Sequence, residues 1–141
     1  MSRTLNMQFI RYVNLFGRIS GVRAKHCFTY NNVIIFVVPE SLIRMAIGQN
    51  NSNLRQLSEI LGKRIHIIAQ PKAKTRQEIE SFVKTIVAPV EFNTFEISGD
   101  VVTITANSEG KARLIGRQRI RQQELQDILD QYFGIKKVII A

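Results

Sequence analysis

Two short segments of this 141-residue sequence combine a glycine with polar or basic side chains in a way that suits an anion. One segment reads Ile47-Gly48-Gln49-Asn50-Asn51, and the other reads Ile115-Gly116-Arg117-Gln118-Arg119. Each glycine is predicted to separate two helices. The first N–H groups of a helix have no partner within it, and the helix dipole makes that end electropositive. Both segments are therefore candidate phosphate sites, where a glycine would let a ligand backbone approach without meeting a Cβ.

The net charge of the chain also indicates an anionic partner. Twenty Lys and Arg residues against eleven Asp and Glu residues give +9 and a pI near 10.2. Residues 1–69 carry nine basic and two acidic residues (+7), and residues 70–141 carry eleven and nine (+2). Nucleic acid is the first candidate for a polyanion of this kind, and an acidic membrane surface is the competitor. The basic helical segments are too often interrupted by acidic residues and strands to lie on a membrane.

Basic residues are concentrated around the second segment. Residues 110–121 contain five Lys and Arg residues and no acidic residue. Guanidinium groups offer forked donors that match phosphate, so Arg117 and Arg119 are expected to be direct ligands, whereas the first segment offers only neutral hydrogen bonds. The full set of candidate phosphate-binding residues is Gly48, Gln49, Asn50, Asn51, Arg55, Gly116, Arg117, Gln118, Arg119 and Arg121.

Several functional classes are not supported by the sequence. Cys27 is the only cysteine, so no internal disulfide is possible, and it has no identifiable base partner. His26 and His66 have no Cys, Asp or Glu at metal-ligand spacing. No nucleophile elbow, Walker A sequence or Gly-x-Gly-x-x-Gly sequence is present. We therefore expect no enzymatic activity, no metal, no cofactor and no small-molecule substrate.

Hydrophobic runs are short throughout the chain. The longest is Val33–Val38, far below the ~20 residues that cross a bilayer. Residues 1–10 lack the apolar stretch of a signal peptide. A soluble cytoplasmic protein with no membrane partner is the expectation.

The elements that must position the two segments follow one order in each half. In the first half, periodicity and turn residues predict a helix at 4–16, strands at 22–28 and 33–38, helices at 39–47 and 52–61, and a strand at 65–69. Strand 33–38 is expected to be buried on both faces or nearly so. Leu54, Leu57, Ile60 and Leu61 are expected to form one apolar side of the fifth element.

In the second half the order recurs after a linker at about residues 70–74. Thr75 and Glu78 predict a capping box that opens a helix through residue 86. The following elements are strands at 92–97 and 101–106, helices at 108–115 and 120–132, and a strand at 135–140. Ser108 is the predicted cap of the second helix. We therefore expect two domains, 1–69 and 70–141.

A shift of 68 positions tests this repeat directly. It superposes Val33 on Val101 and the Ile-Gly pairs of the two segments on each other, together with three further apolar pairs in the following helix. Four extra residues then precede the last strand, so Ile67-Ile68-Ala69 matches Ile139-Ile140-Ala141. The identities fall on expected core positions and on the glycine between two helices, which supports an internal repeat.

Residues 47–61 and 115–129 resemble the glycine-loop core of KH domains, whose loop pattern is Gly-x-x-Gly. Both segments keep the first glycine and replace the last, with Asn51 in one and Arg119 in the other. Two such modules with leading helices resemble the tandem type II KH unit of the transcription factor NusA. Together with Phe9–Phe16, which resembles the first helix of the short archaeal NusA-like proteins, the resemblance to that family covers essentially the whole chain.

This resemblance implies an α+β fold of two tandem type II KH domains. Each would run α-β-β-α-α-β, with a three-stranded sheet packed against helices. It also implies a single-stranded RNA-binding protein that acts in transcription termination or antitermination, with RNA polymerase as a further candidate partner. The glycine loops would hold phosphates, and a groove between the following helix and the sheet edge would take about four bases per module.

The alternative is a KH-fold protein-interaction module that docks on RNA polymerase or a ribonucleoprotein and makes little RNA contact of its own. The missing second glycines motivate this alternative. Under the RNA-binding interpretation, Gly48→Asp and Gly116→Asp are expected to weaken RNA binding while the protein stays folded, because both loops are expected to be exposed.

Overall fold

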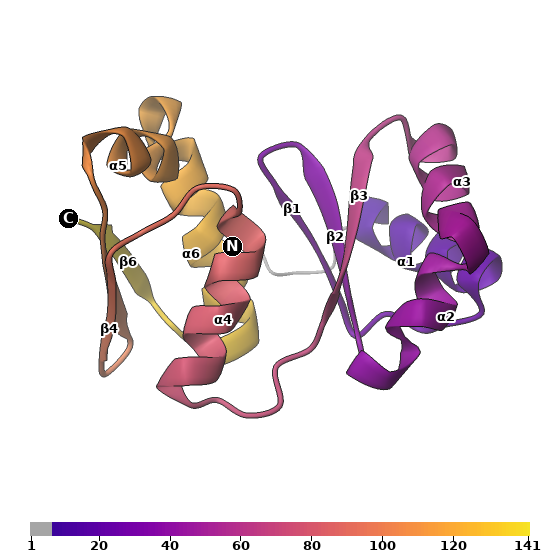
Figure 1. Ribbon diagram of the computed structural model, residues 1–141, viewed down its shortest axis with the longest axis horizontal. Helices are drawn as coiled ribbons and strands as arrows, with labels where there is room; N and C mark the ends of the chain where they lie inside the picture. The colour runs from indigo at the N-terminus through magenta and orange to yellow at the C-terminus, as the bar shows by residue number, and fades with distance from the viewer. Residues whose placement is uncertain (1–6) are drawn as a thin grey trace. The chain divides into compact units, whose positions relative to one another are not determined.

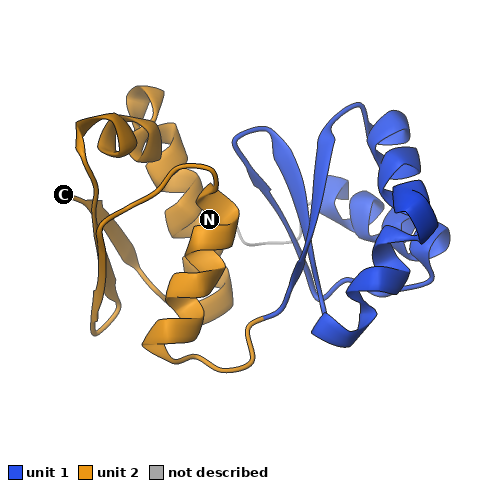
Figure 2. Ribbon diagram, viewed as in Figure 1, with its two compact units in different colours: residues 1–70 blue, residues 71–141 orange. Residues whose placement is uncertain are grey.

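The structure is a computed structural model that describes residues 7–141. The chain divides into two compact units, Met1–Gln70 and Pro71–Ala141 (Figure 2). Residues 4–6 of the first predicted helix lie outside the described residues. Each unit contains one three-stranded sheet and three α-helices, so the predicted α+β class is confirmed.

In the first unit the three helices cover one face of the sheet (Figure 1). The sheet has the order β1-β2-β3, in which β1 runs antiparallel to β2 and β3 runs parallel to it. In chain order the elements are α1 (Met7–Ser20), β1 (His26–Tyr30), β2 (Val33–Val38), the 3-10 turn η1 (Glu40–Leu42), α2 (Ile43–Ile47), the 3-10 turn η2 (Gln49–Asn51), α3 (Ser52–Leu61) and β3 (Arg64–Ala69).

The second unit has the same element order and the same strand directions. Its sheet has the order β4-β5-β6, with β6 parallel to β5 at one edge. Its elements are α4 (Arg76–Val87), β4 (Thr94–Ser98), β5 (Val101–Thr105), α5 (Ser108–Ile115), the 3-10 turn η3 (Arg117–Arg119), α6 (Ile120–Phe133) and β6 (Lys137–Ile140).

The core of the first unit forms where α1 packs on the sheet. The rings of Phe16 on α1 and Phe36 on β2 are stacked with centroids 4.4 Å apart, and both side chains are fully buried. Strand β2 buries five of its six side chains, which confirms the predicted burial of residues 33–38. The prediction for Ile60 is wrong, because this side chain is 55% exposed while Leu57 is fully buried. Ile60 lies at the margin of the apolar stripe of α3 and is left outside the core.

Several strand and helix ends differ from the predictions by two to four residues, as where α1 continues to Ser20 and β6 begins only at Lys137. Two of the differences have an identifiable cause. The predicted strand at 22–28 begins only at His26, because Val22 and Ala24 are buried in the connection that precedes the ladder. Ser108 is not the cap of its helix. The side-chain oxygen of Asn107 accepts a hydrogen bond from Gly110 N at 2.8 Å and caps α5 instead. At the start of α4, Thr75 Oγ1 accepts from Glu78 N at 3.2 Å, which confirms the Thr75 half of the predicted capping box. Glu78 Oε1 accepts instead from Lys72 N at 3.2 Å, so the reciprocal half of the box is not formed.

The sheet register corrects one part of the predicted repeat. Val33 pairs with Arg64 in the first sheet, and Val101 pairs with Lys137 in the second. Since Val101 is Val33 shifted by 68, the last strands correspond through a shift of 137 − 64 = 73. The predicted match used a shift of 72. A register error of one residue places every side chain on the wrong face of a strand, because side chains alternate.

The extra residues of the second unit lie in two places. Helix α6 has 14 residues against 10 in α3, which is about one helical turn more. One further residue precedes β6. Ile67 therefore corresponds to Ile140 and not to Ile139. Exposure agrees with this, because Ile67 and Ile140 are each 7% exposed and Ile139 is 37% exposed.

Among residues 7–141, no helix has both the length and the apolar character needed to cross a membrane.

Candidate nucleic-acid interface

The two predicted phosphate segments fold into the same backbone turn. We call Gly48–Asn51 loop 1 and Gly116–Arg119 loop 2. In loop 1 the N–H of Gly48 donates to Arg44 O at 3.0 Å and the N–H of Asn51 donates to Gly48 O at 3.1 Å. In loop 2 the equivalent bonds measure 2.9 Å and 3.1 Å. Each loop closes one helix and starts the next within four residues, so the repeat seen in the sequence extends to backbone geometry.

The first glycine of each loop is required by the chain itself. Gly48 has φ 84° and ψ 163°, and Gly116 has φ 76° and ψ 173°. A Cβ at Gly48 would lie 2.9 Å from Asn53 N, and a Cβ at Gly116 would lie 2.9 Å from Arg121 N. Neither the backbone conformation nor the space therefore accepts an L side chain.

This geometry corrects the expected reason for the glycines. The Cβ direction of Gly48 and Gly116 points at the first turn of the following helix and not toward a ligand. An Asp side chain at either position would meet that helix first. We therefore expect Gly48→Asp and Gly116→Asp to destabilise the fold, contrary to the prediction from exposure, because exposure of a loop does not imply space at its Cβ.

Each loop continues with two residues in the left-handed αL conformation. Asn50 and Asn51 have φ values of 56° and 61°, and Gln118 and Arg119 have 57° and 64°. The conformation that the missing second glycine would favour is thus present in both loops. Asn tolerates αL better than other non-glycine residues, so loop 2 carries more backbone strain than loop 1.

That strain gives a stability prediction for loop 2. We expect Arg119→Gly to raise the free energy of unfolding by up to about 1 kcal/mol, because glycine removes the αL penalty but gains freedom in the unfolded chain. The same variant should bind RNA more weakly, because it loses a guanidinium. Thermal melts and RNA titrations measure the two effects. Asn51→Gly is the control, with a smaller gain in stability. A lower melting temperature for Arg119→Gly would show that the arginine stabilises the loop.

The side chains of loop 1 are exposed and uncharged. Gln49, Asn50 and Asn51 all face solvent. The guanidinium of Arg55 donates to the carbonyl oxygen of Asn50. Arg55 therefore holds the αL turn from the side of α3, and its positive charge lies directly beside the loop. The structure brings all five residues predicted in the first unit together.

Loop 2 carries exposed charge instead. Arg117, Gln118 and Arg119 face solvent, and within residues 7–141 no acidic side chain forms an ion pair with either arginine. Arg121 has a different role. Its Nε lies 3.3 Å from Glu124 Oε1, and its side chain is only 19% exposed and packs beneath Gly116. Arg121 thus supports the turn, while Arg117 and Arg119 are the side chains available to an anion.

The helices that follow the loops begin without a side-chain cap. Asn51 and Arg119 are the N-cap residues of α3 and α6, and neither accepts a hydrogen bond from the first turn through its side chain. The first N–H of each helix bonds within its loop, from Ser52 to Gln49 O and from Ile120 to Arg117 O. The N–H groups that follow in the first turn are left to an external acceptor. Together with the helix dipole they favour a phosphate at each loop.

Two polar side chains that sequence analysis did not identify lie near loop 2. Gln122 Nε2 donates to Val138 O at 2.7 Å, and Gln126 Oε1 accepts from Val138 N at 3.0 Å. The two glutamines are four residues apart on α6 and both face β6. Their spacing and the strand at 135–140 were both visible in the sequence, but the contact between them was not.

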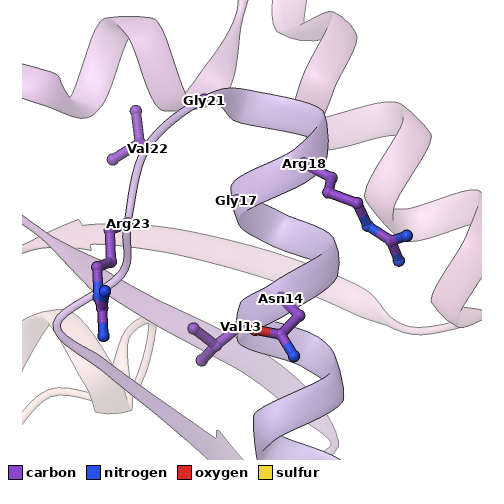
Figure 3. Close-up of a pocket in the computed structure, with 7 residues that line it drawn as sticks. All are labelled: Val13, Asn14, Gly17, Arg18, Gly21, Val22 and Arg23. Atoms are coloured by element: carbon purple, nitrogen blue, oxygen red, sulfur yellow. The ribbon is translucent and has the colours of Figure 1, made fainter.

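A second basic region near α1 does not form an anion site. A hollow of about 400 Å³ lies beside α1 and the segment that follows it, lined by residues that include Asn14, Arg18, Gly21 and Arg23. Figure 3 shows Arg18 projecting from one side of α1 and Arg23 descending from the chain on the other side. The two guanidinium groups therefore do not converge on one point.

The histidines and the cysteine occupy strands. Burial raises the pKa of the Cys27 thiol to about 12, so this thiol is protonated near neutral pH and is a poor nucleophile. Burial lowers the pKa of His26, and burial together with Arg64 lowers the pKa of His66. Both imidazoles are therefore mainly neutral at pH 7. Between residues 7 and 141, no group of three or more His, Cys, Asp or Glu side chains could hold a metal ion.

The chain is similar over nearly its whole length to archaeal proteins named probable transcription termination protein NusA. The protein of Methanococcus vannielii is 25% identical over 141 residues, covering 97% of this chain and 79% of that protein. The protein of Halococcus morrhuae is 24% identical over 144 residues, covering 100% of both chains. The protein of Thermoplasma acidophilum is 22% identical over 142 residues, covering 97% and 94%. These matches confirm the resemblance to archaeal NusA-like proteins predicted from the sequence.

A solved structure has a similar fold. The crystal structure of the protein APE1850 matches with a TM-score of 0.65 and 26% sequence identity, covering 97% of this chain and 100% of that one. No protein-family model matches the chain.

Proposed function

We propose that this chain is a non-catalytic, single-stranded RNA-binding protein that acts in transcription termination. Its two units would be type II KH domains, residues 1–69 and 70–141, each of which holds RNA phosphates at its glycine loop. The element order α-β-β-α-α-β, with the loop between the fourth and fifth main elements, supports this assignment in both units. The role in termination is inferred from the names of the archaeal relatives.

The observation that carries the proposal is the shared backbone of the two loops. Both loops present an uncapped helix start beside polar or basic side chains, although their sequences share only the first glycine. A turn that recurs in geometry but not in composition is expected where backbone N–H groups do the binding. Clamping of a nucleic-acid backbone by such a loop is the binding mode of KH domains.

The loop geometry also bears on the alternative of a protein-docking module. That alternative was motivated by the absence of the second glycines. Since Asn51 and Arg119 adopt the αL conformation that glycine would adopt, their presence does not abolish the loop. We therefore favour RNA binding, with antitermination and a contact to RNA polymerase as further parts of the proposed role.

An NMR titration of the full chain with a short single-stranded RNA tests the proposal. We expect amide shifts around Gly48 and Gly116, because the loops are the proposed contact points. Shifts confined to other surfaces, or no shifts at all, would contradict RNA binding through the loops and would favour the protein-docking alternative.

RNA affinity is further expected to fall steeply with salt concentration. For a single strand the slope of log K against log [salt] is about −0.7 for each phosphate that the protein binds. With roughly four to six bound phosphates, the affinity should fall at least about tenfold between ~50 and ~200 mM salt. Fluorescence anisotropy with a labelled RNA measures this slope. An affinity independent of salt would contradict a site built on phosphates.

A further inference from the structure

Each sheet ends in a strand whose outer edge lies beside the helix that follows a glycine loop. In the first unit this edge strand is β3, and in the second it is β6. Along a parallel ladder, alternate residues direct both N–H and C=O toward the neighbouring strand, and the residues between them direct both groups outward. The outward groups of an edge strand are available hydrogen-bonding positions.

The observed hydrogen bonds identify which residues face outward. Gln70 N donates to Val38 O, so Ile68 and His66 bond to β2, while Ile65 and Ile67 face away from it. In the second unit, Ala141 N donates to Ile104 O. By the same alternation, Val138 and Ile140 face away from β5.

The outer edge of the second unit is closed at Val138 by side chains of α6. Val138 directs its N–H and C=O outward, and both groups are hydrogen-bonded by the amides of Gln126 and Gln122. Both glutamines are partly buried and connect α6 to β6. The space between α6 and the strand edge is therefore bridged at Val138.

The first unit lacks this closure. Through the shift of 68, Gln122 corresponds to Leu54 and Gln126 corresponds to Ser58, and through the register Val138 corresponds to Ile65. A leucine side chain cannot form a hydrogen bond. The hydroxyl of Ser58 donates to Lys63 O at 2.9 Å. The outward N–H and C=O of Ile65 are thus left to solvent or to a ligand.

We propose that base recognition is confined to the first unit, at the open edge of β3, and that the second unit holds RNA by its phosphates alone. Single-stranded RNA is read through hydrogen bonds to base edges, which an open strand edge can supply. Gln122 and Gln126 determine this difference, because their side chains occupy the outward N–H and C=O of Val138. The corresponding groups of Ile65 in the first unit have no such partner among the described residues. The division agrees with the loops, because the unit with the closed edge carries Arg117 and Arg119. This inference rests on the proposed function.

The test compares two ligands of equal charge on the full chain. One is a single-stranded RNA of about eight nucleotides, and the other is an abasic ribose-phosphate oligomer of the same length. The amide shifts of Ile65 and Ile67 should differ between the two ligands. The shift of Val138, whose outward groups are occupied, should be the same with both. Equal base dependence at Val138 and Ile65 would overturn the inference.

The double variant Gln122→Leu, Gln126→Ser gives α6 the side chains that Leu54 and Ser58 provide in the first unit. We expect the amide shift of Val138 to differ between RNA and the abasic oligomer in this variant. The ratio of the affinity for RNA to that for the abasic oligomer should rise roughly fivefold. Gln123→Leu is the matched control, because the Gln123 amide donates to Asp127 Oδ1 at 3.0 Å and does not contact β6. A double variant that binds normally but gains no base dependence would overturn the inference.

Failure of the proposed function has a different signature. If the amides of loop 1 and loop 2 respond to neither ligand, RNA binding itself is refuted and the inference falls with it. If the loops respond to both ligands and Val138 also distinguishes them, only the inference falls. If the double variant does not fold, the comparison of Ile65 with Val138 in the wild-type chain still decides the question.

Discussion

Gly48→Ala and Gly116→Ala are each expected to destabilise their unit by about 2 kcal/mol or more. An alanine would have to hold a positive φ, which costs about 1–3 kcal/mol. Its Cβ would also lie 2.9 Å from a backbone nitrogen of the following helix, at Asn53 in one unit and Arg121 in the other. Backbone at the start of a helix cannot move without breaking the loop turn. The melting temperature should therefore fall by roughly 8–16 °C for a unit of this size.

The chain contains matched controls for this experiment. Gly62 and Gly134 follow α3 and α6 with φ values of 67° and 74°, and a Cβ at either would have nothing within 4 Å. Gly62→Ala and Gly134→Ala therefore incur the conformational penalty of about 1–2 kcal/mol without the collision. If all four variants lose the same stability, the collision with the following helix adds nothing to the destabilisation. The positive φ would then explain the whole loss.

Exchanging the side chains of the two loops should move charge-dependent RNA binding from one loop to the other. The triple variant Arg117→Gln, Gln118→Asn, Arg119→Asn gives loop 2 the side chains of loop 1. Asn is well suited to the αL positions, so the turn should persist, whereas alanine would be strained there. We expect the RNA affinity at ~50 mM salt to fall about tenfold or more, because two charge-assisted hydrogen bonds are removed. The salt slope should become shallower by about 0.7 for each phosphate that the variant no longer binds.

The reciprocal variant tests whether charge alone is responsible. Gln49→Arg with Asn51→Arg should strengthen binding and steepen the salt slope, at some cost in stability from arginine in αL. Lys136→Gln serves as a control for net charge, because Lys136 pairs with Asp130 at 2.9 Å in the second unit and belongs to neither loop. Lys136→Gln removes one positive charge and the loop 2 triple variant removes two. A loss of binding free energy half as large with Lys136→Gln would therefore mean that RNA responds to the overall charge and not to the loop.

Much of the fold could be predicted because it depends on local periodicity. The apolar spacing of α1 and α4 and the Thr75 cap each involve residues within one or two turns of a helix. The internal repeat added a second, independent indication of the same element order. It also located both loops, since an Ile-Gly pair between two apolar stripes identifies a break between helices without any tertiary information.

The errors have two physical causes, which are interactions between segments and backbone conformations that the residue types alone do not fix. The shift between the last strands required the pairing of β3 with β2 and β6 with β5, and an alignment of isoleucines missed it by one residue. Asn107 and Ser108 are adjacent candidates for the same cap, and only the backbone conformation at Asn107 selects between them.

The sequence by itself determined the α+β class, the repeat and the residues of the two loops, because each depends on the order and spacing of residues along the chain. The tertiary structure alone decided what these residues do. It directed the Cβ positions of Gly48 and Gly116 into the next helix. It also placed Gln122 and Gln126 against Val138. These outcomes depend on distances of a few ångströms between atoms of different elements, which no spacing along the chain specifies.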